Sequence, residues 1–118
     1  MTDREEFETA VKALDSKKAE KIKVLKVGDI TILANYFVIA SASSVTHVKA
    51  LADEVEYQLG LKGVHPKSVE GIQSSNWIVL DYIDVIVHVF LEETRDFYNL
   101  EHLWTDGEEV DISGLVTD

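Results

Sequence analysis

Apolar residues recur at three- and four-residue spacing in three stretches of the chain, which is the pattern of amphipathic helices. This pattern predicts helices over residues 3–18, 44–60 and 92–104. The first two follow residues that commonly cap a helix N-terminus, namely Thr2 or Asp3 and Ser43 or Ser44. Each of these two helices has one apolar stripe and one charged side, so we expect the stripe to pack on a sheet.

Five shorter stretches alternate or concentrate apolar residues in the way that strands do: 21–27, 35–42, 67–71, 77–82 and 84–91. Segment 35–42 is almost continuously apolar, which is typical of a strand covered on both faces. The last strand is apolar at both alternating sets of positions, so we expect it in the centre of the sheet. The order of these elements predicts an α/β fold, a single-domain mixed sheet flanked by helices.

The charge balance narrows the choice of partners. The chain has 118 residues, 11 of them basic and 22 acidic, and a formal net charge of −11. Binding to a nucleic-acid backbone needs basic residues, so this balance argues against direct nucleic-acid binding and against anionic membranes. An acidic protein is instead attracted to a basic partner. Without cysteine, an N-terminal signal peptide or an apolar run of about 20 residues, the sequence favours a cytoplasmic protein.

An acidic set raises the possibility of catalysis. Glu70, Asp81 and Asp84 lie on or beside adjacent predicted strands, where carboxylates could hold magnesium for nucleotidyl transfer. However, the Ser-rich turn at 41–44 has no glycine, and Asp81 and Asp84 are three residues apart rather than two. A simpler interpretation is that these aspartates accept backbone N–H groups at a hairpin end. The sequence also lacks a phosphate-binding glycine loop and a metal-spaced histidine pair. We therefore expect no enzyme activity, no cofactor and no metal.

Aromatic residues beside the acidic set point to a different role. Trp77 begins a predicted strand next to a polar loop, and Tyr82 ends that strand. Aromatic anchors supply much of the energy of protein interfaces, so these residues favour a protein-binding surface. For His88, the simplest interpretation is a core histidine whose hydrogen bonds are satisfied inside the protein.

Five stretches of the chain follow one another in an order and spacing that resemble the ribosomal silencing factor family, also called the Iojap family. They are NYFVIASASS at 35–44, HVxAxADxV at 47–55, EG at 70–71, WxxLDYxDVxVHVF at 77–90 and RxFYxLExLW at 95–104. The resemblance covers about residues 5–106. It implies a domain over 1–106, followed by an acidic C-terminal tail over 107–118 that we expect to be loose from Thr105.

The resemblance also implies a fold and a function. The fold would be nucleotidyltransferase-like without the catalytic residues. The function would be to bind the large ribosomal subunit through a basic ribosomal protein, the fourteenth in its naming series, at the face that meets the small subunit. Bound there, the protein would block subunit joining and repress translation when nutrients are scarce. A magnesium-dependent nucleotidyltransferase-like enzyme and a large-subunit assembly factor remain the alternatives.

The expected contact surface combines the aromatic and acidic residues with the start of the third helix. Trp77, Leu80 and Tyr82 would be anchors, and the acidic residues Glu70, Asp81 and Asp84 would pair with basic side chains of the partner. Arg95 and Tyr98 would contribute from the helix. A homodimer is also possible, through a sheet edge or through the apolar side of the third helix.

Overall fold

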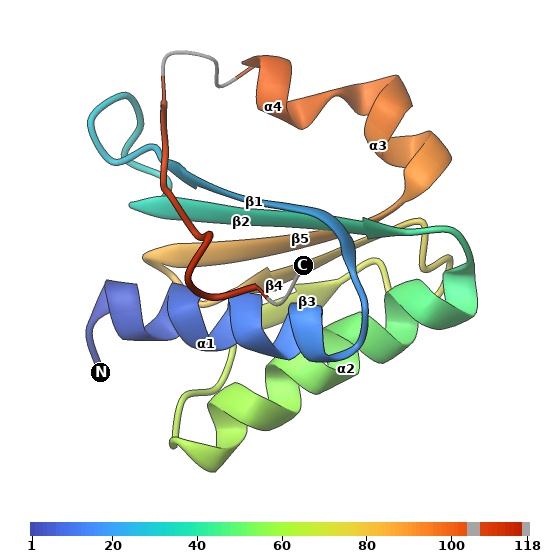
Figure 1. The fold of residues 1–118 in the computed structure, drawn as a ribbon, viewed down its shortest axis with the longest axis horizontal. Helices are drawn as coiled ribbons and strands as arrows, with labels where there is room; N and C mark the ends of the chain where they lie inside the picture. The colour runs from blue at the N-terminus through green and yellow to red at the C-terminus, as the bar shows by residue number, and fades with distance from the viewer. Residues whose placement is uncertain (104–106, 117–118) are drawn as a thin grey trace.

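Six strands form one mixed sheet in the order β3-β4-β5-β2-β1-β6 (Figure 1). The computed structural model describes residues 1–103 and 107–116. Neighbouring strands β2 and β5 run parallel, and the other neighbouring pairs run antiparallel. The strands are β1 (Glu20–Lys26), β2 (Tyr36–Ala42), β3 (Ser68–Glu70), β4 (Trp77–Asp81), β5 (Val85–Leu91) and β6 (Glu108–Glu109). The helices are α1 (Asp3–Ser16), α2 (Val45–Leu61), α3 (Glu92–Tyr98) and α4 (Leu100–Leu103). The predicted α/β class and mixed sheet are confirmed.

Helices α1 and α2 cover one face of the sheet, and their N-termini are capped at the predicted places (Figure 1). The backbone N–H of Glu5 donates to the Thr2 hydroxyl over 3.1 Å, while the Glu5 carboxylate accepts from the Thr2 backbone over 3.0 Å. This reciprocal pair satisfies two helix N–H groups that would otherwise lack partners. The hydroxyl of Ser44 accepts from the backbone N–H of His47 over 3.2 Å. The apolar stripes of both helices then close the main core against the sheet.

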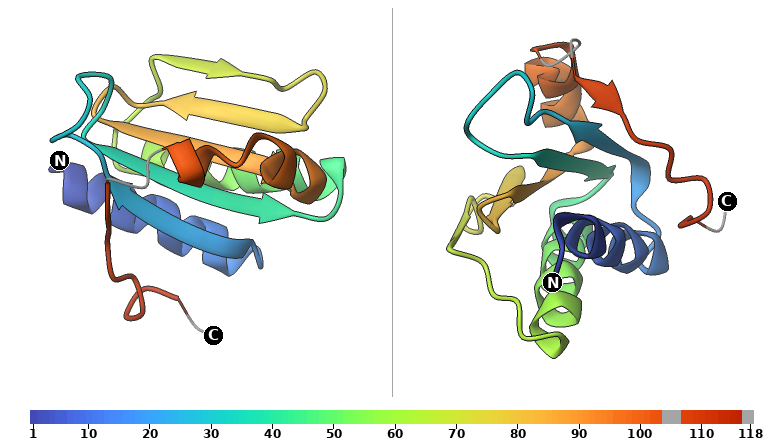
Figure 2. Two further views of the ribbon diagram at one scale, coloured as in Figure 1. Left: turned by 90° about the horizontal axis from the view of Figure 1, so that it is seen from above. Right: turned by 90° about the vertical axis from the view of Figure 1, so that its left-hand side faces the viewer.

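A smaller core lies on the opposite face, where α3 and α4 lie over the sheet (Figures 1 and 2). It contains Leu25, Val27, Ala34, Phe37, Ile39 and Phe90, with Trp77, Ile86 and Leu100 packed against it. Strand β5 contributes to both cores, because Val85, Val87 and Val89 face the helices α1 and α2 while Phe90 faces the other way. The predicted central position of this strand is therefore confirmed.

The segment predicted as a third helix over 92–104 is divided in two. Asn99 ends α3 in a left-handed conformation, with φ 47° and ψ 55°. Its backbone N–H donates to the carbonyl of Arg95 over 2.8 Å, which satisfies one of the free carbonyls at the helix end. Asparagine adopts this conformation more readily than most residues, so the break has a local cause. Residue 104, the predicted helix end, lies outside the described residues.

The C-terminal segment differs from the loose tail that the sequence predicts. Within it, residues 107–116 are described, and β6 pairs with β1 at the edge of the sheet. The backbone N–H of Val110 extends this pairing by donating to the carbonyl of Val24 over 2.8 Å. Beyond β6, Ile112 and Leu115 pack against the main core. Segment 107–116 is thus part of the folded domain. Its apolar residues pack against the core, although its overall composition is acidic.

Candidate functional site

A hollow between the start of β4 and helix α3 gathers three aromatic rings at the surface. It is lined by Ser74, Asn76, Trp77, Glu93, Thr94, Phe97 and Tyr98, encloses about 520 Å³, and is called the aromatic hollow below. The ring centroids of Trp77 and Tyr98 lie 5.2 Å apart, and those of Phe97 and Tyr98 lie 5.1 Å apart with the rings edge to face. Phe97 is 81% exposed and Tyr98 is 54% exposed. Contiguous exposed apolar surface that is rimmed by polar residues marks a candidate interaction site.

Trp77 is held in place from inside the protein. Its indole N–H donates to Nδ1 of His88 over 3.0 Å, and its ring stacks on Phe90 with the centroids 4.8 Å apart. His88 is buried, and burial lowers the pKa of its imidazole to about 4, so the ring is neutral at physiological pH. Because Nδ1 accepts the bond from Trp77, the proton of the neutral ring lies on Nε2. Trp77 therefore presents its ring rather than its N–H to the surface.

The interpretation of His88 as a satisfied core histidine is confirmed in one respect and not in another. Its Nδ1 has the indole as a partner, and its ring lies edge-on to Phe37 with the centroids 5.1 Å apart. Its Nε2, however, is buried and has no hydrogen-bond partner among the residues that the structure describes. The histidine thus supports the aromatic hollow at the cost of one unsatisfied donor.

Arg95 was predicted to contact a partner, but its side chain lies inside the protein. Its guanidinium is buried, where Nε donates to the carboxylate of Glu101 over 2.8 Å and Nη1 donates to the hydroxyl of Ser41 over 3.1 Å. The bond from Arg95 lowers the pKa of Glu101, and the nearby charges of Arg95 and Lys23 lower it further, although burial opposes them. These contacts tie α3 and α4 to β2. Arg95 consequently holds the helix that carries the exposed rings, and its own side chain is not accessible to a partner.

The alternation of side chains along β4 divides the remaining predicted residues between the two faces of the sheet. Trp77 and Asp81 point to the face that carries α3, together with Glu70, whose cross-strand neighbour is Val79. Leu80 and Tyr82 point to the other face, where Leu80 is fully buried and Tyr82 is 6% exposed. The expectation that these two residues anchor a partner is therefore wrong, because both belong to the main core.

The turn chemistry that the sequence favoured for the two aspartates is confirmed for the side chain of Asp81, whereas Asp84 contributes its backbone carbonyl. The carboxylate of Asp81 accepts the backbone N–H of Ile83 over 2.8 Å, which stabilises the turn into β5. Asp84 is exposed, and its backbone carbonyl accepts the N–H groups of Asn35 and Tyr36. The structure describes no group of three or more histidine, cysteine, aspartate or glutamate side chains within residues 1–103 and 107–116 that could hold a metal ion.

The hydroxyl of Tyr82 lies near acidic side chains on the face of the sheet that α1 and α2 cover. Burial raises the pKa of its hydroxyl, and the charges of Glu56 and Glu6 raise it further. Burial also raises the pKa of Glu6, as do the charges of Asp3 and Asp84. The Tyr82 hydroxyl finds no hydrogen-bond partner in the described part of the chain. This end of the domain is thus negative in potential, which suits attraction of a basic partner at a distance.

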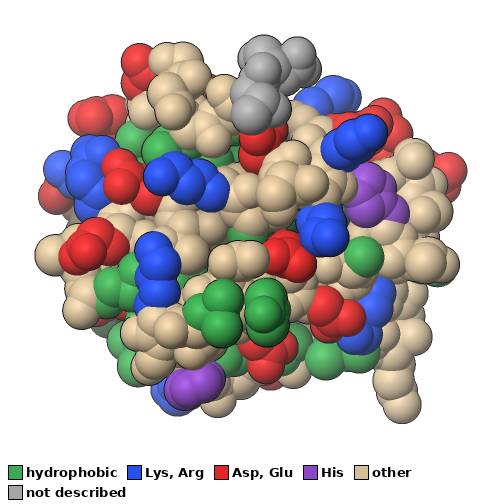
Figure 3. Space-filling model, turned by 60° about the horizontal axis from the view of Figure 1, so that its bottom comes forward, with side chains coloured by type: hydrophobic (Ala, Val, Ile, Leu, Met, Phe, Trp, Pro, Cys, Tyr) green, Lys and Arg blue, Asp and Glu red, His purple; other side chains and the backbone are tan. Residues whose placement is uncertain are grey.

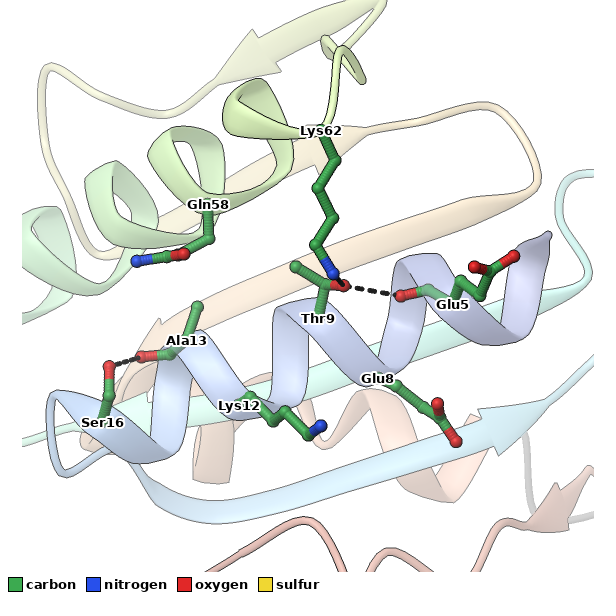
Figure 4. A pocket seen from close by; sticks show the side chains of 8 residues that line it. All are labelled: Glu5, Glu8, Thr9, Lys12, Ala13, Ser16, Gln58 and Lys62. Carbon is green, nitrogen blue, oxygen red and sulfur yellow. Dashed lines mark hydrogen bonds between the residues drawn. The ribbon is translucent and has the colours of Figure 1, made fainter. Parts of the chain in front are cut away.

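A second hollow, of about 470 Å³, lies between α1 and α2 (Figure 4). Its walls carry both charges, with Glu5, Glu8 and Lys12 on α1 and Lys62 at the end of α2. Lys62 is already engaged, since its ammonium donates to the hydroxyl of Thr9 over 3.1 Å. The surrounding face likewise shows acidic and basic side chains interspersed (Figure 3). A surface of such mixed charge does not select a partner, so we regard the aromatic hollow as the candidate site.

Of the eight residues predicted for the site, the structure brings Trp77 and Tyr98 together and places Glu70 and Asp81 on the same face. Phe97 and Glu93 also belong to the site, although they were not predicted. The signal for Phe97 was its adjacency to Tyr98, because neighbouring residues on a helix point about 100° apart and cannot share one narrow buried stripe. The sequence offered no comparable signal for Glu93, which depends on how α3 approaches β4.

Comparison with known proteins assigns the chain to a family. The family model described as "Ribosomal silencing factor during starvation" matches residues 1–118. The chain belongs to this family. A ribosomal silencing factor of Halalkalibacterium halodurans is 36% identical over 117 residues, which cover 99% of this chain and 100% of that protein. The crystal structure of a protein from Chromobacterium violaceum superposes with a TM-score of 0.87 at 34% identity, covering 96% of this chain and 93% of that one.

A similar protein of lower identity has a name that refers to ribosome assembly. The mouse protein called "Mitochondrial assembly of ribosomal large subunit protein 1" is 29% identical over 103 residues, which cover 85% of this chain and 45% of that protein. Within the part of the chain that is described, no helix is long and apolar enough to cross a membrane.

Proposed function

We propose that this chain is a ribosome-associated silencing factor that binds the large ribosomal subunit and prevents the small subunit from joining it. Translation would then fall when nutrients are scarce. The observation that carries the proposal is the match of the ribosomal silencing factor family to residues 1–118, which is the whole chain. The family description denotes a regulatory factor, and the proposed action involves no chemical step. The proposed role would be carried out in the cytoplasm, with the ribosomes.

The mechanism is steric. The domain measures 33 × 33 × 30 Å along its principal axes, so a bound copy occupies space at the subunit interface that the small subunit needs. The partner on the large subunit is a basic ribosomal protein, the fourteenth in its naming series. The net charge of −11 attracts the chain to a basic protein and repels it from exposed RNA phosphates. Charge thereby favours one protein patch on a surface that is mostly RNA.

The aromatic hollow supports a docking surface on the face that carries α3. Phe97 and Tyr98 supply exposed rings, and Trp77 supplies a ring fixed from below by His88. Glu70 and Asp81 add carboxylates on the same face of the sheet. Rings at the centre of an interface typically carry most of its binding energy, and charges at the rim mainly set the rate of encounter.

Co-sedimentation with purified large subunits tests this surface. We expect Phe97→Ala combined with Tyr98→Ala to weaken binding at least tenfold, equivalent to about 1.4 kcal/mol. Both side chains are mostly in solvent, so the double variant should fold normally, which circular dichroism checks. Tyr57→Ala is the matched control, because Tyr57 is 60% exposed on α2, across the sheet from the hollow. Normal affinity of the folded double variant would place the interface elsewhere on the molecule.

A role in assembling the large subunit is the second candidate, and the name of the mouse relative favours it. The two roles separate in cells depleted of the protein. A silencing role predicts normal large subunits and too many joined ribosomes under starvation. An assembly role predicts an accumulation of immature large subunits during growth, before any nutrient limitation.

A further inference from the structure

The walls of the aromatic hollow have a chemistry that selects among possible occupants. One wall comes from the segment leading into β4 and carries Ser74, Asn76 and Trp77, while α3 supplies the other wall. Together they present three rings, the carboxylate of Glu93, two hydroxyl side chains and one amide. None of the described residues that line the hollow is basic. The hollow is therefore rich in π faces and oxygen acceptors, with one negative charge.

These walls disfavour two classes of occupant. A phosphate or carboxylate would meet Glu93 without a cation to offset the repulsion. A purely apolar side chain would bury the acceptor groups of the hollow without giving them a hydrogen bond, which costs binding energy. A cation avoids both of these unfavourable effects, because it is attracted to the ring faces and to the carboxylate of Glu93 at once.

The internal bond of Trp77 makes the preference for a cation stronger. Its indole N–H is directed inward to His88, so it does not face the hollow as a donor. Phe90 covers one face of the indole ring, and the remainder of the electron-rich ring borders the hollow, 5.2 Å from the ring of Tyr98 between centroids. Between the two natural cationic side chains, arginine suits such walls better, since its planar and weakly hydrated guanidinium stacks on rings while its N–H groups reach oxygen acceptors.

We propose that the aromatic hollow receives an arginine side chain of the partner protein, stacked against Trp77 and Tyr98 and paired with Glu93. This assignment rests on the proposed function for the source of the arginine, a basic ribosomal protein. It also agrees with the net charge of −11, which brings basic proteins to the surface before any specific contact forms. The site is defined by its chemistry, however, so it can be tested without a ribosome.

The test uses the full chain and three blocked tripeptides that differ at their central residue, which is arginine, lysine or citrulline. Citrulline has nearly the shape of arginine but no charge. Nuclear magnetic resonance shifts of the Trp77 indole N–H and of the Ser74 and Thr94 amides report on the hollow. We expect the arginine peptide to shift these signals with a Kd of roughly millimolar order, the lysine peptide to bind more weakly, and citrulline to leave them unchanged.

Variants distinguish binding of the peptide in the aromatic hollow from a general attraction of a basic peptide to an acidic protein. Glu93→Gln should weaken binding of the arginine peptide by about threefold, and Tyr98→Ala should weaken it by at least as much. The matched controls are Glu56→Gln and Tyr57→Ala, which remove an exposed carboxylate and ring from a different hollow on α2. They should leave the affinity unchanged. Equal shifts at both hollows, or equal binding of arginine and citrulline, would overturn the assignment.

The same variants keep this inference distinct from the proposed function. Large-subunit binding that requires Phe97 and Tyr98 but is indifferent to Glu93→Gln would overturn the arginine assignment and leave the silencing role standing. Selective binding of the arginine peptide by a protein that does not bind ribosomes would support the hollow and overturn the proposed function.

Discussion

Acid should destabilise this protein through His88, because the folded structure keeps that imidazole neutral. Burial lowers its pKa from the ordinary value of 6.5 to about 4. In the folded state Nδ1 accepts the indole N–H of Trp77, and protonation would replace this acceptor with a second donor. The unfolded chain has no such constraint, so its histidine titrates near the ordinary value.

The sign and size of the effect follow from the two pKa values. As the pH falls from about 6.5 to about 4, the unfolded chain binds a proton that the folded chain excludes, so the free energy of unfolding decreases. Below about pH 4 both states are protonated and this contribution levels off. Each pH unit between the two pKa values corresponds to about 1.4 kcal/mol, which gives a total loss on the order of 3 kcal/mol. Such a loss is a large fraction of the stability of a typical small domain.

Urea denaturation followed by far-ultraviolet circular dichroism measures this loss when it is repeated from about pH 7 to about pH 4. His88→Phe is the comparison, because phenylalanine keeps a ring beside Phe37 and Phe90 but does not titrate. Carboxylates with lowered pKa values, such as Glu101, also destabilise the fold in acid, but they act equally in both proteins. We expect the wild-type curve to fall more steeply, by about 3 kcal/mol over the range. Parallel curves would refute the reasoning about His88.

Two further predictions concern the framework of the site. Gly71 has φ +87°, and a Cβ there would lie 2.0 Å from the carbonyl oxygen of Trp77, so Gly71→Ala should lower the free energy of unfolding by at least about 2 kcal/mol. Gly114→Ala, which meets nothing within 4 Å, should change it by less than about 0.5 kcal/mol in the same denaturation assay. Arg95→Leu leaves the Glu101 carboxylate without its main partner and should cost about 2 kcal/mol, seen as a lower melting temperature in calorimetry. An unchanged melting temperature would mean that the buried Arg95 guanidinium, through Glu101 and Ser41, does not hold α3 in place.

The sequence predicted the fold well where local patterns decide it. Residues 84–91 are apolar at both alternating sets of positions, and β5 is buried on both faces as that pattern implies. Thr2 and Ser44 cap α1 and α2 because their hydroxyls need only the backbone three residues ahead. The small strand β6 was missed, since two acidic residues, Glu108 and Glu109, have little strand propensity and depend on pairing with β1.

The site was predicted less completely, and the reasons differ between residues. The alternation along β4 already placed Leu80 and Tyr82 on the opposite face from Trp77, so grouping all three as anchors disregarded a signal that the sequence contained. Arg95 is different, because its partner Ser41 lies 54 residues away in the chain and only the packed fold brings the two together.

The yield of joined ribosomes tests the central claim most directly. Purified protein is added to separated large and small subunits under conditions that favour joining, and the products are separated on a sucrose gradient. We predict that the joined fraction falls as the protein saturates the large subunit. The Phe97→Ala, Tyr98→Ala double variant should need at least tenfold more protein for the same decrease, whereas Tyr57→Ala should act like the wild type. An unchanged yield of joined ribosomes, with the protein demonstrably bound to every large subunit, would contradict the account.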